Sequence, residues 1–369
     1  MRNVRSVYIH IPFCNKICSY CDFCKMFYNK KFVSSYLEAL DREIYDVYRG
    51  EKLETIYIGG GTPSSLDISE LKTLFSTLEM LDRSSSCEFT IECNVENTDE
   101  EKIKLFSEVG INRISFGVES FNAKNLSLLE RESSYEKVVK LVSLCRKYGI
   151  NNINVDLMYA LPDEDIDVLR KDLEMILSLD VEHISTYSLI IEDHTKLSIN
   201  GIKNISEDLD SEMYDVICDE MKKHGYSHYE ISNFCKEGYE SRHNLCYWNN
   251  STYYGFGLGA SGYIDNRRYS NTRSLNEYID GNIIVEEDYL CDEDLMEYEV
   301  ILNLRKSSGI SLKSFLDKFE INLFDYCDYE KLIKDGFLVL KNNHLFIPED
   351  KWYISNEIIV KLLEGVKYE

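Results

Sequence analysis

The sequence predicts an α/β fold built on a parallel sheet, followed by a smaller α-rich domain. Two observations predict it: short β-branched runs alternate with amphipathic helical patterns through the first 225 residues, and this alternation stops afterwards. Repeated strand–helix units place parallel strands in one sheet with the helices outside it. Six units are visible, two fewer than a closed eight-unit barrel needs. An open doubly wound sheet and a partial barrel therefore both remain.

The individual elements follow from residue type and spacing. The strand candidates are short apolar runs, in order Val7–Ile11, Glu54–Gly59, Glu88–Glu92, Arg113–Val118, Asn152–Met158 and His183–Ile191. The helix candidates have apolar residues three and four apart, in order Lys31–Arg49, Ile68–Leu81, Asp99–Val109, Tyr135–Tyr148, Asp165–Leu179 and Ser206–His224. In either architecture, functional side chains gather at the C-terminal ends of the strands.

The C-terminal part of the chain has a different character. Residues 226–290 are rich in Tyr, Asn and Gly, and we expect them to form a connecting region. Helical patterns return at Asp294–Lys306, Leu312–Lys318 and Tyr329–Asp335, before a hairpin-like stretch at Phe337–Ile347. This order is typical of a helical, winged-helix-like domain. We therefore expect three parts, 1–225, 226–290 and 291–369.

Charge and cysteine content limit the classes of function. With 41 Lys and Arg against 65 Asp and Glu, the net charge is −24, which argues against a nucleic-acid-binding surface. No apolar run is long enough for an integral membrane segment, although peripheral contact with a membrane-bound partner stays compatible with the sequence. Met1–Arg5 is polar and basic and leads into no signal-like segment. We therefore expect a cytoplasmic protein whose 12 cysteines are reduced.

Four of these cysteines lie within eleven residues, directly after the first strand. They are Cys14, Cys18, Cys21 and Cys24. The spacing of the first three lets a short loop wrap three thiolates around a [4Fe–4S] cluster, which leaves the fourth iron open to another ligand. A structural zinc site, a closed cluster that also uses Cys24, and ordinary buried thiols are alternatives. Zinc sites usually use two separated pairs, and closed clusters usually have another spacing.

Two further motifs end the second and third strands. Ile58-Gly-Gly-Gly-Thr-Pro63 lets the backbone approach a ligand closely, and it lacks the Lys-Ser/Thr of a phosphate-binding loop. Read alone, it is also compatible with a tight strand-to-helix turn. Glu92 places a carboxylate at a strand end, where it can accept hydrogen bonds from ligand hydroxyls or simply be solvated.

With Tyr20 before the third cysteine, and with the lead-in Tyr8-Ile-His-Ile-Pro-Phe-Cys14, the segment resembles the radical S-adenosylmethionine (SAM) superfamily. Within it, the chain resembles the family of the oxygen-independent coproporphyrinogen III oxidase and the haem chaperone HemW, from about Val7 to the C-terminal helices. The resemblance implies a partial (β/α)6 TIM-like radical SAM barrel, a [4Fe–4S] cluster on Cys14, Cys18 and Cys21, and SAM on the open iron. It also implies an electron donor for the cluster. In such proteins the reduced cluster can cleave SAM to a carbon radical.

The same resemblance implies the SAM contacts, which are Tyr8, Tyr20, Gly60, Gly61, Thr62, Glu92, Glu119, Arg131 and Asp156. Three positions depart from the family pattern. Glu119 stands where Gln is usual, which removes a donor and adds a charge. Ser261 stands where His is frequent, and Cys24 matches neither relative. We expect Cys24 to be a small buried side chain, because a fourth thiolate would block SAM.

A second constellation reads Arg242-His243-Asn244-Leu-Cys-Tyr247-Trp248. Imidazole is a common axial haem ligand, and Tyr and Trp rings provide a flat wall for a macrocycle. A single His in an aromatic stretch is, however, more often a core residue. The order His-Asn-x-x-Tyr-Trp resembles the haem-binding signature of HemW, and this resemblance implies that His243 contacts haem, with Tyr247 and Trp248 as the wall of the site. Cys246 is an unmatched local thiol.

These features favour a haem chaperone that passes haem to an acceptor protein, with the SAM-bound cluster as a switch. The alternative is a radical enzyme that resembles the oxidase and decarboxylates two propionates of a porphyrinogen. Such a substrate would need Arg or Lys at the barrel mouth, and this chain is strongly acidic. A third hypothesis is a radical SAM enzyme with another substrate, and no catalytic residue is assigned.

Overall fold

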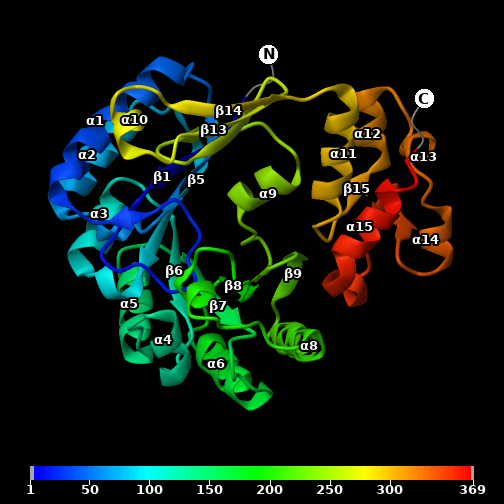
Figure 1. Cartoon of the computed structure of the whole chain (residues 1–369), viewed down its shortest axis with the longest axis horizontal. Coiled ribbons are helices and arrows are strands. Elements are labelled where there is room, and N and C mark those ends of the chain that lie inside the picture. Colours follow the sequence, from blue (N-terminus) through cyan, green and yellow to red (C-terminus); the bar gives the residue numbers. More distant parts are fainter. Residues whose placement is uncertain (1–3, 367–369) are drawn as a thin grey trace.

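The computed structural model describes residues 4–366 and has a central sheet of nine strands (Figure 1). The six predicted strands are adjacent and in sequence order, as β1 (Ser6–Ile11), β4 (Leu53–Gly60), β5 (Arg83–Asn94), β6 (Arg113–Glu119), β7 (Asn152–Tyr159) and β8 (His183–Ser188). All five pairings between them are parallel. A doubly wound sheet would reverse its strand order at a switch point. The sequential order therefore selects the partial barrel from the two predicted architectures.

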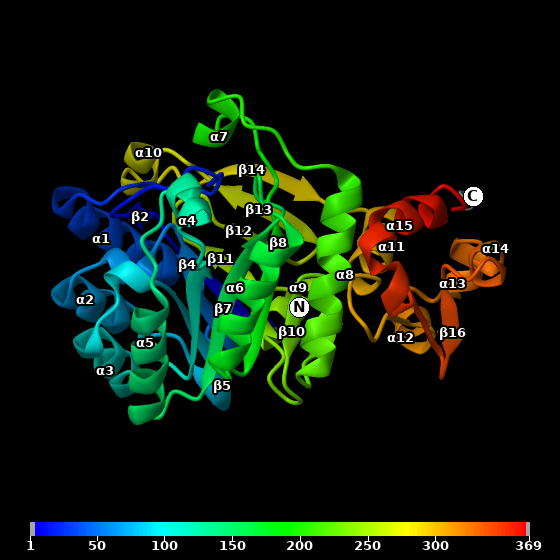
Figure 2. The same cartoon turned by 90° about the horizontal axis from the view of Figure 1, so that it is seen from below.

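The helices that follow these strands lie on the outside of the curved sheet, as Figures 1 and 2 show. The six predicted helices are α1 (Lys30–Val47), α2 (Ile68–Leu78), α3 (Glu100–Glu108), α5 (Tyr135–Lys147), α6 (Ile166–Ser178) and α8 (Glu207–Lys223). The predicted ends differ from the observed ones by at most three residues, and the starts of α2 and α5 coincide. The loops also contain short elements that were not predicted: β2 (Phe13–Cys14), β3 (Met26–Phe27), α4 (Ala123–Leu129) and α7 (Lys196–Ile199), with 3-10 turns at Pro63–Ser65 and Val95–Asn97.

Three strands extend the sheet beyond the predicted six. β11 (Tyr254–Phe256) pairs in parallel with β1, and the antiparallel strands β10 (Asn233–Cys235) and β9 (Ser227–Glu230) follow β8 at the other edge. The sheet does not close on itself. Helix α9 (Arg242–Trp248) connects β10 to β11 and lies between the two edges of the sheet (Figure 1).

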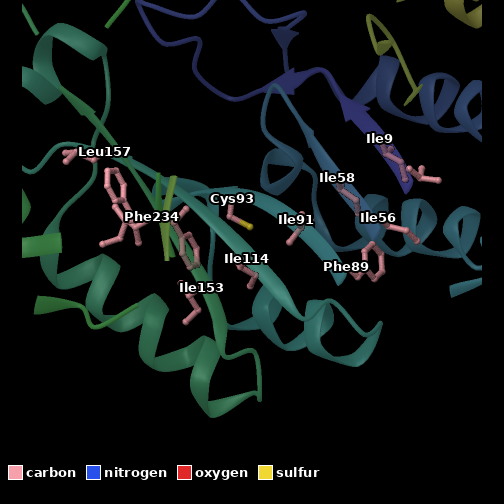
Figure 3. Close-up of a cluster of buried hydrophobic side chains, with 14 of the residues drawn as sticks. Ile9, Ile56, Ile58, Phe89, Ile91, Cys93, Ile114, Ile153, Leu157 and Phe234 are labelled. Atoms are coloured by element: carbon pink, nitrogen blue, oxygen red, sulfur yellow. The ribbon is translucent and has the colours of Figure 1, made fainter. Parts of the chain in front are cut away.

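Side chains alternate between the two faces of the barrel strands. The outward residues pack against the helices, and Figure 3 shows Ile56, Ile91 and Ile153 in this layer. The inward residues are polar or aromatic. They include Tyr8, Tyr57, Glu92, Arg113, Asn154, Asp156 and His183. A TIM barrel normally fills its interior with branched apolar side chains. This polar interior is therefore suited to polar ligands and to hydrogen-bond networks.

The rest of the chain forms two smaller sheets and a helical domain. β12 (Ser261–Ile264), β13 (Arg267–Asn271) and β14 (Ile284–Tyr289) form one antiparallel sheet, with α10 (Leu275–Ile279) between β13 and β14. The C-terminal domain contains α11 (Asp292–Asn303), β15 (Ile310–Ser311), α12 (Leu312–Phe319), α13 (Leu323–Tyr326), α14 (Glu330–Lys334), β16 (Val339–Lys341), β17 (His344–Phe346), a 3-10 helix at Glu349–Ile354 and α15 (Ser355–Leu363). Helices with a three-stranded antiparallel sheet agree with the predicted α-rich, winged-helix-like domain.

The predicted division at 225 and 290 remains a prediction, and its outermost residues, 1–3 and 367–369, lie outside the described part. In the chain from 4 to 366, no helix combines the length and the apolarity needed to cross a membrane.

Candidate functional site

A cavity of about 460 Å³ opens at the C-terminal ends of the barrel strands. Cys14, Cys18 and Cys21 line it together with eight of the nine predicted SAM contacts, which are Tyr20, Gly60, Gly61, Thr62, Glu92, Glu119, Arg131 and Asp156. These residues come from five strand ends or the loops after them. Tertiary structure therefore brings the cysteine loop, the glycine motif and four separate charged side chains to one place.

The cysteine loop is anchored at both ends and in its middle. β2 pairs with β3, so the segments before and after the cysteines lie side by side. In the middle, Ser19 donates from its backbone N–H to the Leu129 carbonyl at 3.3 Å and from its hydroxyl to the Leu128 carbonyl at 2.6 Å. Among the described residues, no three metal-ligating side chains converge on one ion position. A [4Fe–4S] cluster needs no such convergence, because each thiolate binds a different iron. The three thiols at one cavity wall therefore fit a cluster with an open iron.

The three glycines of the motif are needed because neighbouring groups pack too closely against them for a larger side chain. A Cβ on Gly61 would lie 2.8 Å from the Cys14 Sγ and from the Pro12 carbonyl. A Cβ on Gly59 would lie 2.9 Å from the Glu92 carboxylate, and Gly60 has φ = +122° beside the His10 ring. No larger residue fits these contacts without displacing the cysteine loop or Glu92. The motif therefore positions two walls of the cavity in addition to its predicted contact with SAM.

Arg131 is a buried cation, 7% exposed, with two carboxylate partners. Its Nε lies 3.1 Å from Glu96 Oε1, and its Nη1 lies 3.7 Å from Glu119 Oε1 and 3.7 Å from the Cys18 Sγ. Tyr20 donates to the same Glu119 oxygen at 3.0 Å. Burial raises the pKa of Glu119 to about 7, and Arg131 opposes this rise. Glu119, where the family usually has Gln, therefore forms an ion pair with Arg131, and Arg131 also contacts Cys18 of the cysteine loop.

Glu92 lies at the end of β5 and accepts two hydrogen bonds. Tyr57 donates to its Oε1 at 2.8 Å, and the Gly60 N–H donates to its Oε2 at 3.1 Å. Burial raises the pKa of Glu92 to about 7, although these two donors and Arg113 work against the rise. The remaining lone pairs of the carboxylate face the cavity, where a ligand hydroxyl can donate to them.

Asp156 is the second buried carboxylate at this depth. Asn154 donates to its Oδ1 at 2.7 Å, and Ser115 donates to its Oδ2 at 3.3 Å. Burial raises its pKa. Beneath both carboxylates lies Arg113, which is buried and whose Nε has no hydrogen-bond partner in the described structure.

Three sequence-predicted features lie away from this cavity. Tyr8 is not in its lining, and its hydroxyl hydrogen-bonds His10 Nδ1 at 3.0 Å. Cys24 also lies outside the lining and packs against Gly259, whose added Cβ would be 2.6 Å from the Cys24 Cβ. Cys24 is half-buried, whereas we expected a buried side chain. Ser261 is exposed on β12, with its hydroxyl 3.1 Å from that of Ser270.

The His-Asn-x-x-Tyr-Trp segment forms α9 at the opposite end of the barrel. Glu88, near the start of the paired part of β5, accepts from the backbone N–H groups of Arg242 and His243 at 3.1 and 3.0 Å. The His243 side chain is 1% exposed, with Nδ1 2.8 Å from the Thr55 hydroxyl and Nε2 2.8 Å from the Tyr247 hydroxyl. Burial lowers the pKa of His243 to about 3, so its ring is neutral. In this arrangement neither ring nitrogen is available to an iron atom.

The other end of α9 contacts the C-terminal domain. The Arg305 guanidinium lies 5.9 Å from the Trp248 ring, and Lys306 donates to the Asn249 side chain. Asn250 donates to Glu299 on α11 at 3.2 Å. The predicted wall residues Tyr247 and Trp248 are half-buried, Tyr247 on the barrel and Trp248 towards the C-terminal domain.

Several residues of these two sites were not singled out from the sequence. Glu96 binds Arg131, Tyr57 binds Glu92, and Glu88 holds α9. The alternation of the strands indicates that Tyr57 and Glu88 face inward, but it does not indicate their partners. Glu96 lies in the short 3-10 turn after β5, and nothing in the sequence marks it.

Comparison with known proteins agrees with this geometry. Residues 8–176 match the family model of the radical SAM superfamily, and residues 290–350 match that of the HemN C-terminal domain. A haem chaperone HemW of Lactococcus lactis subsp. lactis (strain IL1403) is 39% identical over 98% of this chain and 98% of its own length. The HemW of Bacillus subtilis (strain 168) is 40% identical over 96% of this chain and 98% of its own.

Among solved structures, the chain is similar to the coproporphyrinogen III oxidase HemN from Escherichia coli, described as a radical SAM enzyme. The TM-score is 0.85 at 21% sequence identity, and the match covers 97% of this chain and 90% of the other. At this identity the likeness concerns the fold, which extends over the barrel and the C-terminal domain.

Proposed function

This chain belongs to the radical SAM superfamily and, within it, to the family of the haem chaperone HemW, and from this premise we propose that it binds haem and delivers it to an acceptor protein. The three cysteines would hold a [4Fe–4S] cluster, and the cavity beside them would take SAM. The full-length similarity to HemW relatives, together with the His-Asn-x-x-Tyr-Trp segment on α9, carries this proposal.

Each residue of the cavity has a separate task in this proposal. Cys14, Cys18 and Cys21 hold three irons and leave the fourth for SAM. Glu92 and Asp156 accept hydrogen bonds from ligand hydroxyls, while Arg131 balances Glu119 beside the cluster loop. A SAM-ligated cluster supplies one-electron chemistry when an electron donor reduces it. In a chaperone, this occupied site would act as a switch, with the cytoplasm as the proposed compartment.

The cavity lining supports the chaperone over the oxidase-like alternative. A porphyrinogen with several propionates needs cations at the barrel mouth. The lining instead contains five carboxylates, on Asp22, Glu92, Glu119, Asp156 and Glu192, and only two cations, on Lys16 and Arg131. Arg131 is already paired with Glu96 and Glu119. Anaerobic incubation with SAM, reductant and coproporphyrinogen tests the alternative, and formation of decarboxylated product would overturn the chaperone proposal.

A haem titration after anaerobic reconstitution tests the proposed function directly. We expect one haem per chain with a Soret band that changes in His243→Ala, together with at least tenfold weaker binding. His224→Ala is the matched control, because His224 is exposed at the end of α8 and has no contact with α9. An unchanged spectrum and affinity in His243→Ala would exclude an axial role for this residue.

A further inference from the structure

Haem binding by His243 requires α9 to leave its place in the barrel. The imidazole is buried and both of its nitrogens are hydrogen-bonded, to Thr55 and to Tyr247. An axial ligand must present a free nitrogen lone pair to a macrocycle several ångströms wide. We call the conformation of the structure, with α9 packed on the barrel, the seated conformation, and one in which α9 has moved away from the barrel the withdrawn conformation. Haem can bind through His243 only in the withdrawn conformation, so haem shifts the population from the seated to the withdrawn conformation.

The helix that must move is held on its far side by an incompletely satisfied polar junction. Arg305 lies there with its guanidinium 5.9 Å from the Trp248 ring, and its Nε is buried without a hydrogen-bond partner in the described structure. Lys306 is buried as well, and burial lowers its pKa to about 8. Buried groups that lack partners weaken an interface, because they lose their hydration without full compensation. This junction therefore lowers the free-energy cost of withdrawing α9.

One side chain joins seated α9 to the predicted SAM site. The Tyr57 ring stacks on the His243 ring, with centroids 5.1 Å apart and an interplanar angle of 27°. The hydroxyl of the same Tyr57 donates to Glu92 Oε1 at 2.8 Å. Seated α9 thus holds Tyr57, and Tyr57 holds the carboxylate in the orientation that faces the cavity. Withdrawal of α9 removes one of the two rings that stack on Tyr57, the other being Tyr8, and so weakens one of the two hydrogen bonds that orient Glu92.

We infer that Tyr57 is a positioning residue that couples the two sites, so that SAM and haem oppose each other's binding. This inference rests on the proposed function, since it assumes that haem binds through His243. SAM binds better to the seated conformation, in which Glu92 is preorganised, whereas haem requires the withdrawn one. By linkage, each ligand weakens the other by the same factor. Loading of the barrel with SAM therefore favours release of haem, which gives the chaperone its delivery step.

The test measures both affinities in the anaerobically reconstituted protein. Haem is titrated by its Soret band with and without saturating SAM, and SAM is titrated with and without bound haem. We expect SAM to raise the Kd of haem about tenfold, within the usual range of coupling between sites, and haem to raise the Kd of SAM by the same factor. Equal Kd values with and without the other ligand would overturn the inference.

Tyr57→Phe separates positioning from packing, because it keeps the ring on His243 and removes only the hydroxyl. We expect the factor by which SAM and haem weaken each other to fall to about twofold or less. Tyr254→Phe is the matched control: Tyr254 is a buried tyrosine of the same sheet that donates to Glu51 at 2.9 Å, away from both sites. A full coupling factor in Tyr57→Phe, or a lost one in Tyr254→Phe, would contradict the role of Tyr57.

Hydrogen exchange of residues 242–248 provides a readout that does not depend on the variant. SAM should slow this exchange in the wild-type holoprotein, and haem should accelerate it. If SAM leaves the exchange of residues 242–248 unchanged, the inferred coupling between the SAM and haem sites is contradicted, even when haem binds. If haem does not bind at all, the proposed function fails, while slower exchange with SAM would still show that α9 responds to the cavity.

Discussion

At the end of the barrel where the strands terminate, thiols and charged side chains line an open cavity, whereas at the opposite end α9 is packed into a closed network. Both ends carry a recognisable motif, but only the first presents its groups to a ligand. In the cavity, the ligand-facing atoms keep free lone pairs or thiols. Around α9, each ring nitrogen of His243 already has a partner. The two ends thus differ in availability: the groups of the cavity can contact a ligand as they stand, whereas the proposed haem contact of His243 needs a conformational change of α9.

The largest expected effect concerns the open end. Cys18→Ala should abolish cluster assembly, because two thiolates cannot hold the cube against loss of iron. Iron and acid-labile sulfide per chain after anaerobic reconstitution measure this. Cys24→Ala is the matched control and should keep full iron content, since Cys24 packs against Gly259 outside the cavity. Loss of the cluster in Cys24→Ala would mean that the fourth cysteine is a ligand after all.

The second-largest effect follows from breaking the buried ion pairs of Arg131. Arg131→Met leaves Glu96 and Glu119 beside the cavity without their cation, and we expect a loss of about 3–5 kcal/mol in the free energy of unfolding. Urea denaturation measures it. Lys124→Met removes an exposed pair with Asp163 and should cost less than about 1 kcal/mol. Equal costs for the two variants would show that the cavity is already well solvated.

The closed end should respond to acid through His228. This ring lies between Phe234 and Trp352, with centroids 4.1 and 4.3 Å away, and burial lowers its pKa from 6.5 to about 4. The unfolded chain therefore binds a proton at a higher pH than the folded one. The contribution of His228 is fully present above pH 6.5, is lost as the pH falls towards 4, and amounts to at most about 3 kcal/mol.

Comparison of wild type with His228→Phe isolates the pH-dependent contribution of His228 to the free energy of unfolding, because Phe keeps the aromatic packing but does not titrate. Denaturation midpoints between pH 7 and pH 4 should fall less steeply in the variant. Trp352 fluorescence follows whether the C-terminal domain separates from the barrel. Identical pH profiles would assign the acid sensitivity to other groups.

The smallest effect should loosen α9 without altering the cavity. Glu88→Gln keeps one acceptor oxygen and places an NH2 group opposite the second N–H of α9, so one of the two hydrogen bonds is lost, and we expect the packing of α9 on the barrel to weaken by about 1 kcal/mol. Hydrogen exchange of residues 242–248 should become about fivefold faster, and haem should bind more tightly. Iron content should not change. Unaltered exchange would show that other contacts hold α9.

Much of the fold could be predicted because it depends on local periodicity. The six barrel strands and their helices were located within a few residues, since burial of one face imposes a period of two or 3.6 on the sequence. The third helix, expected at Asp99–Val109, is α3 at Glu100–Glu108, with Asp99 as its N-cap. The three cysteines and the glycine motif were recognisable for a related reason, because their function depends on close spacing along the chain.

The rest depended on contacts between distant segments. β11 and α9 are short, and their conformations are stabilised by β1 and Glu88 rather than by their own residues. Arg131 could be a surface charge or a buried one, and its contacts with Glu96, 35 residues away, and with Glu119 decide between them. His243 was compatible with a haem ligand and with a core histidine.

The sequence by itself determined the strand–helix units, the cysteine loop and the His-Asn-x-x-Tyr-Trp segment, because each is encoded by neighbouring residues. Only the tertiary structure decided which of these groups are exposed to a ligand. Whether a side chain can contact a ligand depends on its hydrogen-bond partners and on packing from other parts of the chain. For His243 the partners are Thr55 on β4 and Tyr247 on α9 itself.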